Sequence, residues 1–98
     1  MKEITAKEVE NLLNEGKKLN IIDVREVGEV SQGKIPGAVN IPLGVIPART
    51  MDLDRNTEYV MVCRSGGRSA QATSFLEAQG FKVINMRGGM LDWKGKTE

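Results

Sequence analysis

The sequence predicts an α/β fold in which a parallel sheet is covered by helices on both faces. Short runs rich in β-branched residues alternate along the chain with segments of helical pattern, and this alternation is typical of parallel sheets whose crossovers are helices. The strand pattern is clear at 19–24, which reads Leu-Asn-Ile-Ile-Asp-Val. The clearest helix pattern covers 69–79, directly after a strand and a glycine-bearing loop.

The first half of the chain begins with a short strand and a helix. Ile4 is expected to end the strand, and the helix is predicted over 6–15 because Thr5 and Glu8 have the spacing of a capping box. Gly16 stands where a glycine commonly ends a helix. The other elements expected in this half are the strand over 19–24, a helical turn within 25–31, a turn over 33–37, a short strand over 38–41 and a short helix over 43–49 that Pro47 interrupts.

The second half is expected to hold two strands, one long helix and a final turn. The predicted inward stripe of the helix over 69–79 consists of Ala72, Phe75, Leu76 and Gln79. The strands are expected over 59–62 and 81–86, and a last turn over 90–94 places Trp93 beneath the sheet. Because ligands of parallel sheets bind at the carboxyl ends of strands, we expect a site just after residue 62.

The segment that follows residue 62 predicts an anion-binding loop around a cysteine. Residues 63–69 read Cys-Arg-Ser-Gly-Gly-Arg-Ser, and Cys63 is the only cysteine in the chain. Backbone N–H groups of a tight loop can converge on one centre, and the helix behind adds its N-terminal partial charge. Gly66 and Gly67 are expected to supply the positive φ angles that such a loop needs. These neighbours all favour a thiolate at Cys63.

Length and composition exclude several classes of function. The chain has 98 residues, which predicts one domain over 1–98, and its net charge of +1 gives no argument for nucleic-acid binding. No apolar stretch is long enough to span a membrane, and the N-terminus has no apolar signal region, so a cytoplasmic location is expected. One cysteine excludes an internal disulfide. The absence of histidine excludes Cys-His and Ser-His catalysis and argues against a zinc site, and no metal or cofactor is expected.

Four motifs in this order resemble the single-domain rhodaneses, the thiosulfate sulfurtransferase-like family. They are the segments 23–26 (Asp-Val-Arg-Glu), 33–42 (Gly-Lys-Ile-Pro-Gly-Ala-Val-Asn-Ile-Pro), 63–69, and the glycine pair 88–89 followed by Trp93. The resemblance implies a three-layer fold with a five-stranded parallel sheet and helices on both faces. Lys34 stands where the family more often has histidine, and Val30 stands where an aromatic residue is common, which bears on substrate or partner preference.

The resemblance also implies a chemistry for Cys63. Its thiolate would attack the outer sulfur of a small anionic donor such as thiosulfate and hold that sulfur as a persulfide. Cyanide, a thiol or a partner protein would then accept the sulfur. The alternative for a lone cysteine is a buried, unreactive side chain.

The polar residues around Cys63 have two possible roles each. Arg64 and Arg68 are expected to bind the donor and the departing anion, with Arg68 the stronger candidate, and the alternative is a pair of solvated arginines. Ser65 and Ser69 are expected to donate hydrogen bonds to the persulfide, and Ser69 is also a candidate N-cap for the helix.

Asp23 and Arg25, at the end of another strand, are expected to form a structural ion pair that supports the neighbouring loops.

Other functions are consistent with a cysteine loop of this kind. A phosphatase or arsenate reductase of the same fold carries C-x5-R, whereas four residues separate Cys63 from Arg68 here. Arsenate reduction would also need a second thiol. A non-catalytic binding module is the remaining alternative, and the presence of Cys63 argues against it.

Overall fold

Five parallel strands form one sheet in the order β1-β5-β4-β2-β3. The computed structural model describes residues 1–98. The strands are β1 (Glu3–Thr5), β2 (Asn20–Asp23), β3 (Val39–Asn40), β4 (Glu58–Val62) and β5 (Lys82–Arg87), and the helices are α1 (Ala6–Asn14), α2 (Val27–Val30), α3 (Gly67–Ala78) and the 3-10 helices η1 (Leu43–Asp52) and η2 (Gly89–Asp92). The predicted fold class, a five-stranded parallel sheet with helices on both faces, is confirmed.

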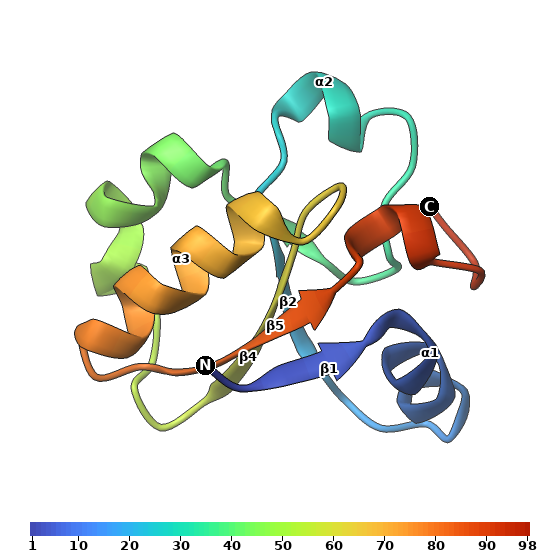
Figure 1. Cartoon of the computed structure of the whole chain (residues 1–98), viewed down its shortest axis with the longest axis horizontal. Helices are drawn as coiled ribbons and strands as arrows, with labels where there is room; N and C mark the ends of the chain where they lie inside the picture. Colours follow the sequence, from blue (N-terminus) through green and yellow to red (C-terminus); the bar gives the residue numbers. More distant parts are fainter.

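The core lies in two apolar clusters, one on each face of the sheet. Successive residues of a strand point to opposite faces, so Ile22 of β2 joins one cluster and Ile21 joins the other. The first cluster is covered by α3 and η1, which contribute Leu76 and Ile46. The second is covered by α1, which contributes Val9, and by η2. Figure 1 shows α3 and α1 on opposite sides of the strands.

The predicted capping box starts α1. Thr5 Oγ1 accepts the backbone N–H of Glu8 at 3.1 Å, and Glu8 Oε1 accepts the backbone N–H of Thr5 at 2.9 Å, which satisfies two amides that the helix leaves free. The segment predicted as a short interrupted helix over 43–49 forms η1 instead, a 3-10 helix that includes Pro47 and continues to Asp52.

The inward face of α3 differs from the predicted one. Its buried residues are Ser69, Ala72, Thr73 and Leu76, whereas Phe75 is 37% exposed and Gln79 is exposed. The helix is therefore rotated relative to the predicted stripe, and two hydroxyl groups replace Phe75 and Gln79 on the buried side. Thr73 Oγ1 donates to the backbone oxygen of Ser69 at 2.7 Å, which satisfies its hydroxyl without a partner outside the helix.

The carboxyl ends of the central strands meet at one edge of the sheet. Asp23 at the end of β2 pairs with Val62 at the end of β4, so the loops after both strands start side by side. Figure 1 shows α2, the loop between β4 and α3, and η2 gathered at this end of the molecule. This is the edge at which the sequence places the cysteine loop.

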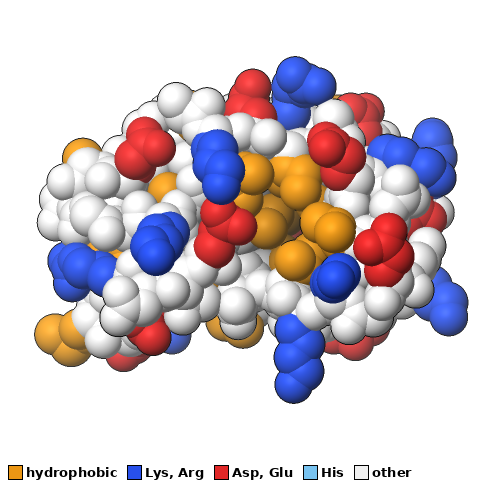
Figure 2. Space-filling view, turned by 90° about the horizontal axis from the view of Figure 1, so that it is seen from below, with side chains coloured by type: hydrophobic (Ala, Val, Ile, Leu, Met, Phe, Trp, Pro, Cys, Tyr) orange, Lys and Arg blue, Asp and Glu red, His pale blue; other side chains and the backbone are white.

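The surface carries charges of both signs. Figure 2 shows one face with a central hollow of hydrophobic side chains, surrounded by acidic and basic side chains that alternate without a large patch of either sign. None of the helices combines the length and apolar character that a membrane span requires.

Candidate active site

Cys63 is the first residue after β4 and lies at the base of the loop that leads into α3. The residue is buried, with 0% of its surface exposed. Its Sγ accepts the backbone N–H of Gly66 at 3.0 Å and the hydroxyl of Ser69 at 3.3 Å. The loop amides therefore face the sulfur, which is the arrangement that an anionic cysteine needs.

The surroundings of Cys63 favour the thiolate. Burial raises the pKa of the Cys63 thiol, but hydrogen bonds from the Ser69 hydroxyl and from the backbone amides of Ser69, Gly66 and Ser65 outweigh it. The pKa of Cys63 is consequently below its ordinary value. The thiolate of Cys63 is therefore populated at a lower pH than that of a free cysteine, and the thiolate is the form in which cysteine acts as a nucleophile.

Gly66 shapes the loop, and Gly67 does not have its predicted role. Gly66 has a φ of +104° and caps α3, and a Cβ there would lie 3.1 Å from the backbone N of Gly88. Gly67 is the first residue of α3 and has no positive φ. The loop needs only one left-handed residue, because the chain turns into the helix immediately after Gly66. Ser69 is consequently in the first turn of α3, and its predicted role as the N-cap is wrong.

The helix η2 supports the cysteine loop from behind. The backbone N–H groups of Met90 and Leu91 donate to the carbonyl oxygens of Cys63 and Arg64, at 2.9 and 3.0 Å. Gly89 makes this approach possible, since a Cβ at that position would lie 2.5 Å from both carbonyl oxygens. The glycine pair at 88–89 therefore lets a second segment hold the orientation of the loop.

The hydroxyl of Ser69 has two acceptors within reach. It lies 3.3 Å from Cys63 Sγ and 3.2 Å from the Gly66 carbonyl oxygen, and a serine carries one hydroxyl hydrogen. The same carbonyl oxygen accepts the backbone N–H of Ala70 at 3.1 Å and Asn85 Nδ2 at 3.3 Å. Because a carbonyl has two lone pairs, these donors leave the Ser69 hydrogen free to face the sulfur.

The two arginines of the loop lie in different environments. Arg64 is exposed, and its guanidinium makes no ion pair. Arg68 points to α2, where Nη1 and Nη2 donate to the two carboxylate oxygens of Glu29 at 2.6 and 2.8 Å. Ser65 is exposed and faces the sulfur with its backbone amide alone. The expected donor-binding guanidinium of Arg68 is thus already bound to a carboxylate.

Asp23 and Arg25 form the structural ion pair that the sequence predicts. Both are buried, and Arg25 donates to the Asp23 carboxylate from Nε at 3.0 Å and from Nη2 at 2.8 Å. Arg25 Nη2 also donates to the Gly33 carbonyl oxygen at 2.8 Å. Asn40 of β3 donates to the carbonyl oxygens of both residues, at 2.9 Å each. The pair therefore connects the ends of β2 and β3 with the chain after α2.

Lys34, which departs from the family pattern, contacts the end of the chain. Its Nζ donates to the carbonyl oxygen of Ala38 at 3.0 Å and forms an ion pair with Glu98. Backbone hydrogen bonds in both directions also join Lys34 to Glu98. Its side chain consequently supports a loop and does not contact Cys63.

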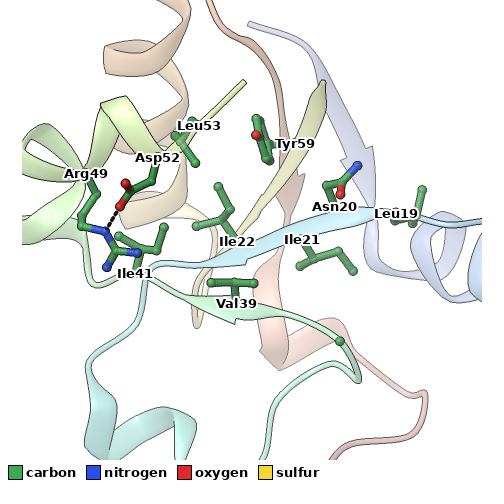
Figure 3. Close-up of a pocket in the computed structure, with 11 residues that line it drawn as sticks. Leu19, Asn20, Ile21, Ile22, Val39, Ile41, Arg49, Asp52, Leu53 and Tyr59 are labelled. Carbon is green, nitrogen blue, oxygen red and sulfur yellow. Dashed lines mark hydrogen bonds and ion pairs between the residues drawn. The ribbon is translucent and has the colours of Figure 1, made fainter. Parts of the chain in front are cut away.

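The hollows of the surface lie away from the cysteine loop. One of about 220 Å³ runs along the edge of the sheet between β2, β3 and η1, and Figure 3 shows Ile22, Val39 and Tyr59 along it with the Arg49–Asp52 ion pair at one end. A second is lined by residues of α1 and of the segment 93–96. Neither includes a residue of 63–69, so the candidate site is defined by the chemistry of the buried cysteine. The chain has no cluster of three or more metal-binding side chains.

Three residues that contact the cysteine loop were missed by sequence reasoning. Glu29 and Asn85 reach the loop only through the fold, since they are 39 and 19 residues from their partners Arg68 and Gly66. The sequence identifies Gly89 only as part of the glycine pair at 88–89, without its contact to the loop. Its neighbour Gly88 and the apolar strand before it were the available signal, because paired glycines at a strand end often mark a close backbone approach.

The fold and the site together define an α/β domain with a buried cysteine, held by loop amides, at the carboxyl end of a parallel sheet. The chain belongs to the rhodanese-like family, whose domain model matches residues 5–96.

Individual relatives agree with this assignment. YtwF of Bacillus subtilis, provisionally named a sulfurtransferase, is 44% identical over 98 residues, covering 100% of this chain and 95% of that protein. A protein of Allochromatium vinosum named sulfurtransferase is 36% identical, covering 93% of this chain and 86% of that protein. A rhodanese-like domain protein from Staphylococcus aureus superposes with a TM-score of 0.94 at 40% identity, covering 100% of this chain and 97% of that chain. These relatives support sulfurtransferase activity.

Proposed function

We propose that the chain moves a sulfane sulfur from thiosulfate, or a similar small anionic donor, to a thiophilic acceptor through a persulfide on Cys63. The observation that supports this most is the hydrogen bonding of Cys63 Sγ by Gly66 N–H and the Ser69 hydroxyl. These donors stabilise a negative charge on sulfur, which both the attacking thiolate and the persulfide carry.

In the first step the Cys63 thiolate forms a bond to the outer sulfur of the donor. The sulfur–sulfur bond of thiosulfate breaks at the same time, and its electron pair leaves with sulfite. Cys63 then carries one additional sulfur atom, and the loop amides that hydrogen-bond Cys63 would stabilise the charge of the persulfide.

In the second step an acceptor nucleophile forms a bond to that outer sulfur. The electron pair of the Cys63 sulfur–sulfur bond returns to Cys63 as a thiolate. Cyanide would leave as thiocyanate, and a cellular thiol or a cysteine of a partner protein would leave as a persulfide. The cycle needs no resident cofactor, because the cysteine itself accepts and releases the transferred group.

The direct test is the intact mass of the protein after incubation with thiosulfate. We expect a gain of one sulfur atom that cyanide removes, with the sulfite and thiocyanate formed in proportion. A phosphatase or a binding module would show no such gain. An unchanged mass after incubation with thiosulfate and with an organic persulfide would refute the proposal.

The first prediction concerns Cys63→Ser. This variant should lose persulfide formation and sulfur transfer entirely, because its hydroxyl is not a nucleophile at this site, while the fold survives such a small change. Circular dichroism and thermal unfolding check the fold, and Ser65→Ala provides a matched variant in the same loop. Transfer that persists in Cys63→Ser would show that another group carries the sulfur.

A further inference from the structure

The ion pair between Glu29 and Arg68 lies within electrostatic range of Cys63, because the Cys63 charge is one of the groups that raise the pKa of Arg68. Arg68 donates two hydrogen bonds to Glu29, one to each carboxylate oxygen, in the fork geometry that guanidinium and carboxylate favour. The two side chains are 34% and 32% exposed, so the pair is only partly screened by water.

Glu29 is held in this position independently of Arg68. Its Oε1 also accepts the backbone N–H of Glu26 at 3.0 Å, which is the capping contact at the start of α2. These contacts, with Arg68 first and the Glu26 amide next, lower the pKa of Glu29 to about 2, and the carboxylate raises the pKa of Arg68. Both groups are therefore fully charged at neutral pH.

A paired arginine attracts an anion much less than a free one. The opposite charges of Arg68 and Glu29 nearly cancel at a donor in the loop, and the carboxylate repels a dianion twice as strongly as a monoanion. Arg64 is the one guanidinium of the loop without an ion pair, and it is exposed to solvent. The positive charge available for binding a dianion is consequently smaller than the sequence suggests.

We propose that Glu29 is a specificity-determining residue, which neutralises Arg68 and thereby favours sulfur donors with one negative charge over dianionic thiosulfate. The proposal rests on the sulfur transfer by Cys63 proposed above. The donor class it favours includes thiosulfonates and organic persulfides, whose outer sulfur is attacked in the same way. The leaving group is then a sulfinate or a thiolate, which takes the electron pair of the broken sulfur–sulfur bond.

The test compares two donors that differ in charge and share their reacting bond. Thiosulfate is a dianion and benzenethiosulfonate is a monoanion, and both release an oxidised sulfur leaving group when the outer sulfur is transferred. Persulfide formation on Cys63 is followed by intact mass. The measured quantity is the second-order rate with thiosulfate divided by the second-order rate with benzenethiosulfonate. A variant that changes the pKa or nucleophilicity of Cys63 changes the rates with both donors, so this change cancels in the ratio.

We expect Glu29→Gln to raise the ratio in favour of thiosulfate roughly tenfold, since it frees the charge of Arg68 beside a dianion. Added salt should reduce this gain. Glu26→Gln is the control, because Glu26 makes no ion pair with Arg68 and its charge affects the pKa of Arg68 less than Glu29 does. This variant should change the ratio less than about twofold. An unchanged ratio in Glu29→Gln, or equal changes in both variants, would overturn the proposal.

A charge cycle at the same pair keeps the test independent of any one variant. Arg68→Gln leaves Glu29 unpaired and should lower the ratio, and the double variant Glu29→Gln/Arg68→Gln should return it toward that of the wild type. If Arg68 bound the donor directly, the double variant would instead show a ratio as low as that of Arg68→Gln. That result would overturn the proposal while leaving the sulfur transfer intact. Absence of persulfide in the wild type with both donors would overturn the proposed function itself.

Discussion

The pKa of Cys63 depends in part on the direction of one hydroxyl hydrogen. Ser69 can donate it to the sulfur or to the Gly66 carbonyl oxygen, and Asn85 and Ala70 already donate to that carbonyl. We therefore expect Asn85 to affect the thiolate indirectly, because it occupies the Gly66 carbonyl oxygen to which Ser69 could otherwise donate. A hydroxyl that turns to the sulfur stabilises the anion more than the neutral thiol, which lowers the pKa of Cys63.

We predict that Ser69→Ala raises the pKa of Cys63, because the anion loses its side-chain hydrogen bond. Asn85→Ala should raise it by a smaller amount, since the Ser69 hydroxyl then turns partly back to Gly66. The rate of alkylation by iodoacetamide as a function of pH measures both shifts.

Ser65→Ala is the control for these two variants. Ser65 contributes only its backbone amide to the hydrogen bonding of Cys63. The alkylation rate of Ser65→Ala should therefore depend on pH as it does in the wild type. Identical midpoints for Ser69→Ala and Ser65→Ala would show that the Ser69 hydroxyl does not face the sulfur.

At the scale of single residues, the sequence identifies groups that are close along the chain. Cys63, Gly66 and Ser69 lie in one short segment, so their meeting follows from the local turn. Glu29 and Asn85 could not be predicted as neighbours of that segment, because only strand order and crossover geometry bring them to it. The role of Arg68 was consequently predicted without the carboxylate that changes it.

Among the secondary-structure elements, α2 depends most on its neighbours. A helix of four residues has no stability of its own, so it is held by its end contacts and by the ion pair to α3. This pair fixes α2 over the loop that contains Cys63. Its contribution to stability follows the ionisation of Glu29.

We predict that the stabilisation from Glu29 is lost in acid. The pKa of Glu29 is about 2 in the folded protein, below its ordinary value of 4.5. The folded state therefore favours the ionised form, so this stabilisation is complete above about pH 4.5 and disappears as the pH falls toward 2. The difference in Tm between wild type and Glu29→Gln should shrink over that range. A difference in Tm that stays constant over this pH range would contradict the prediction. So would a Glu26→Gln variant whose difference from the wild type shrinks in the same way.

The positions of the elements could be predicted well, but the orientation of α3 could not. Capping residues, strand-forming runs and turn glycines are local signals, and they place the elements within a few residues. The rotation of α3 depends on Ser69 and Thr73 being buried, and polar residues are normally assigned to the surface. Their hydroxyls are satisfied by the cysteine loop and by the helix backbone, which sequence patterns do not reveal.

For the whole molecule, stability comes from the two clusters that cover the sheet. Leu76 is fully buried in the same cluster as Cys63, whereas the adjacent Phe75 is 37% exposed. Cys63 is thus part of a packed core, and its position depends on the packing of that core.

We predict that Leu76→Ala lowers the free energy of unfolding by about 2–5 kcal/mol, because it leaves a cavity that the sheet and η1 cannot fill. For a domain of this size each kcal/mol corresponds to roughly 4–8 °C in Tm. Phe75→Ala should cost clearly less, although phenylalanine is larger. Urea and thermal unfolding measure both, and the reverse order would show that α3 presents the face predicted from the sequence.

The short outer strands of the sheet have a consequence for behaviour at high concentration. The edge strands β1 and β3 contain three and two residues, so each edge of the sheet offers few free backbone groups to a second molecule. Long unpaired edge strands are templates for pairing with the sheet of another molecule, which leads to aggregation. Short edge strands offer too few hydrogen bonds to support such pairing. This architecture therefore helps to keep neighbouring copies apart in a crowded solution.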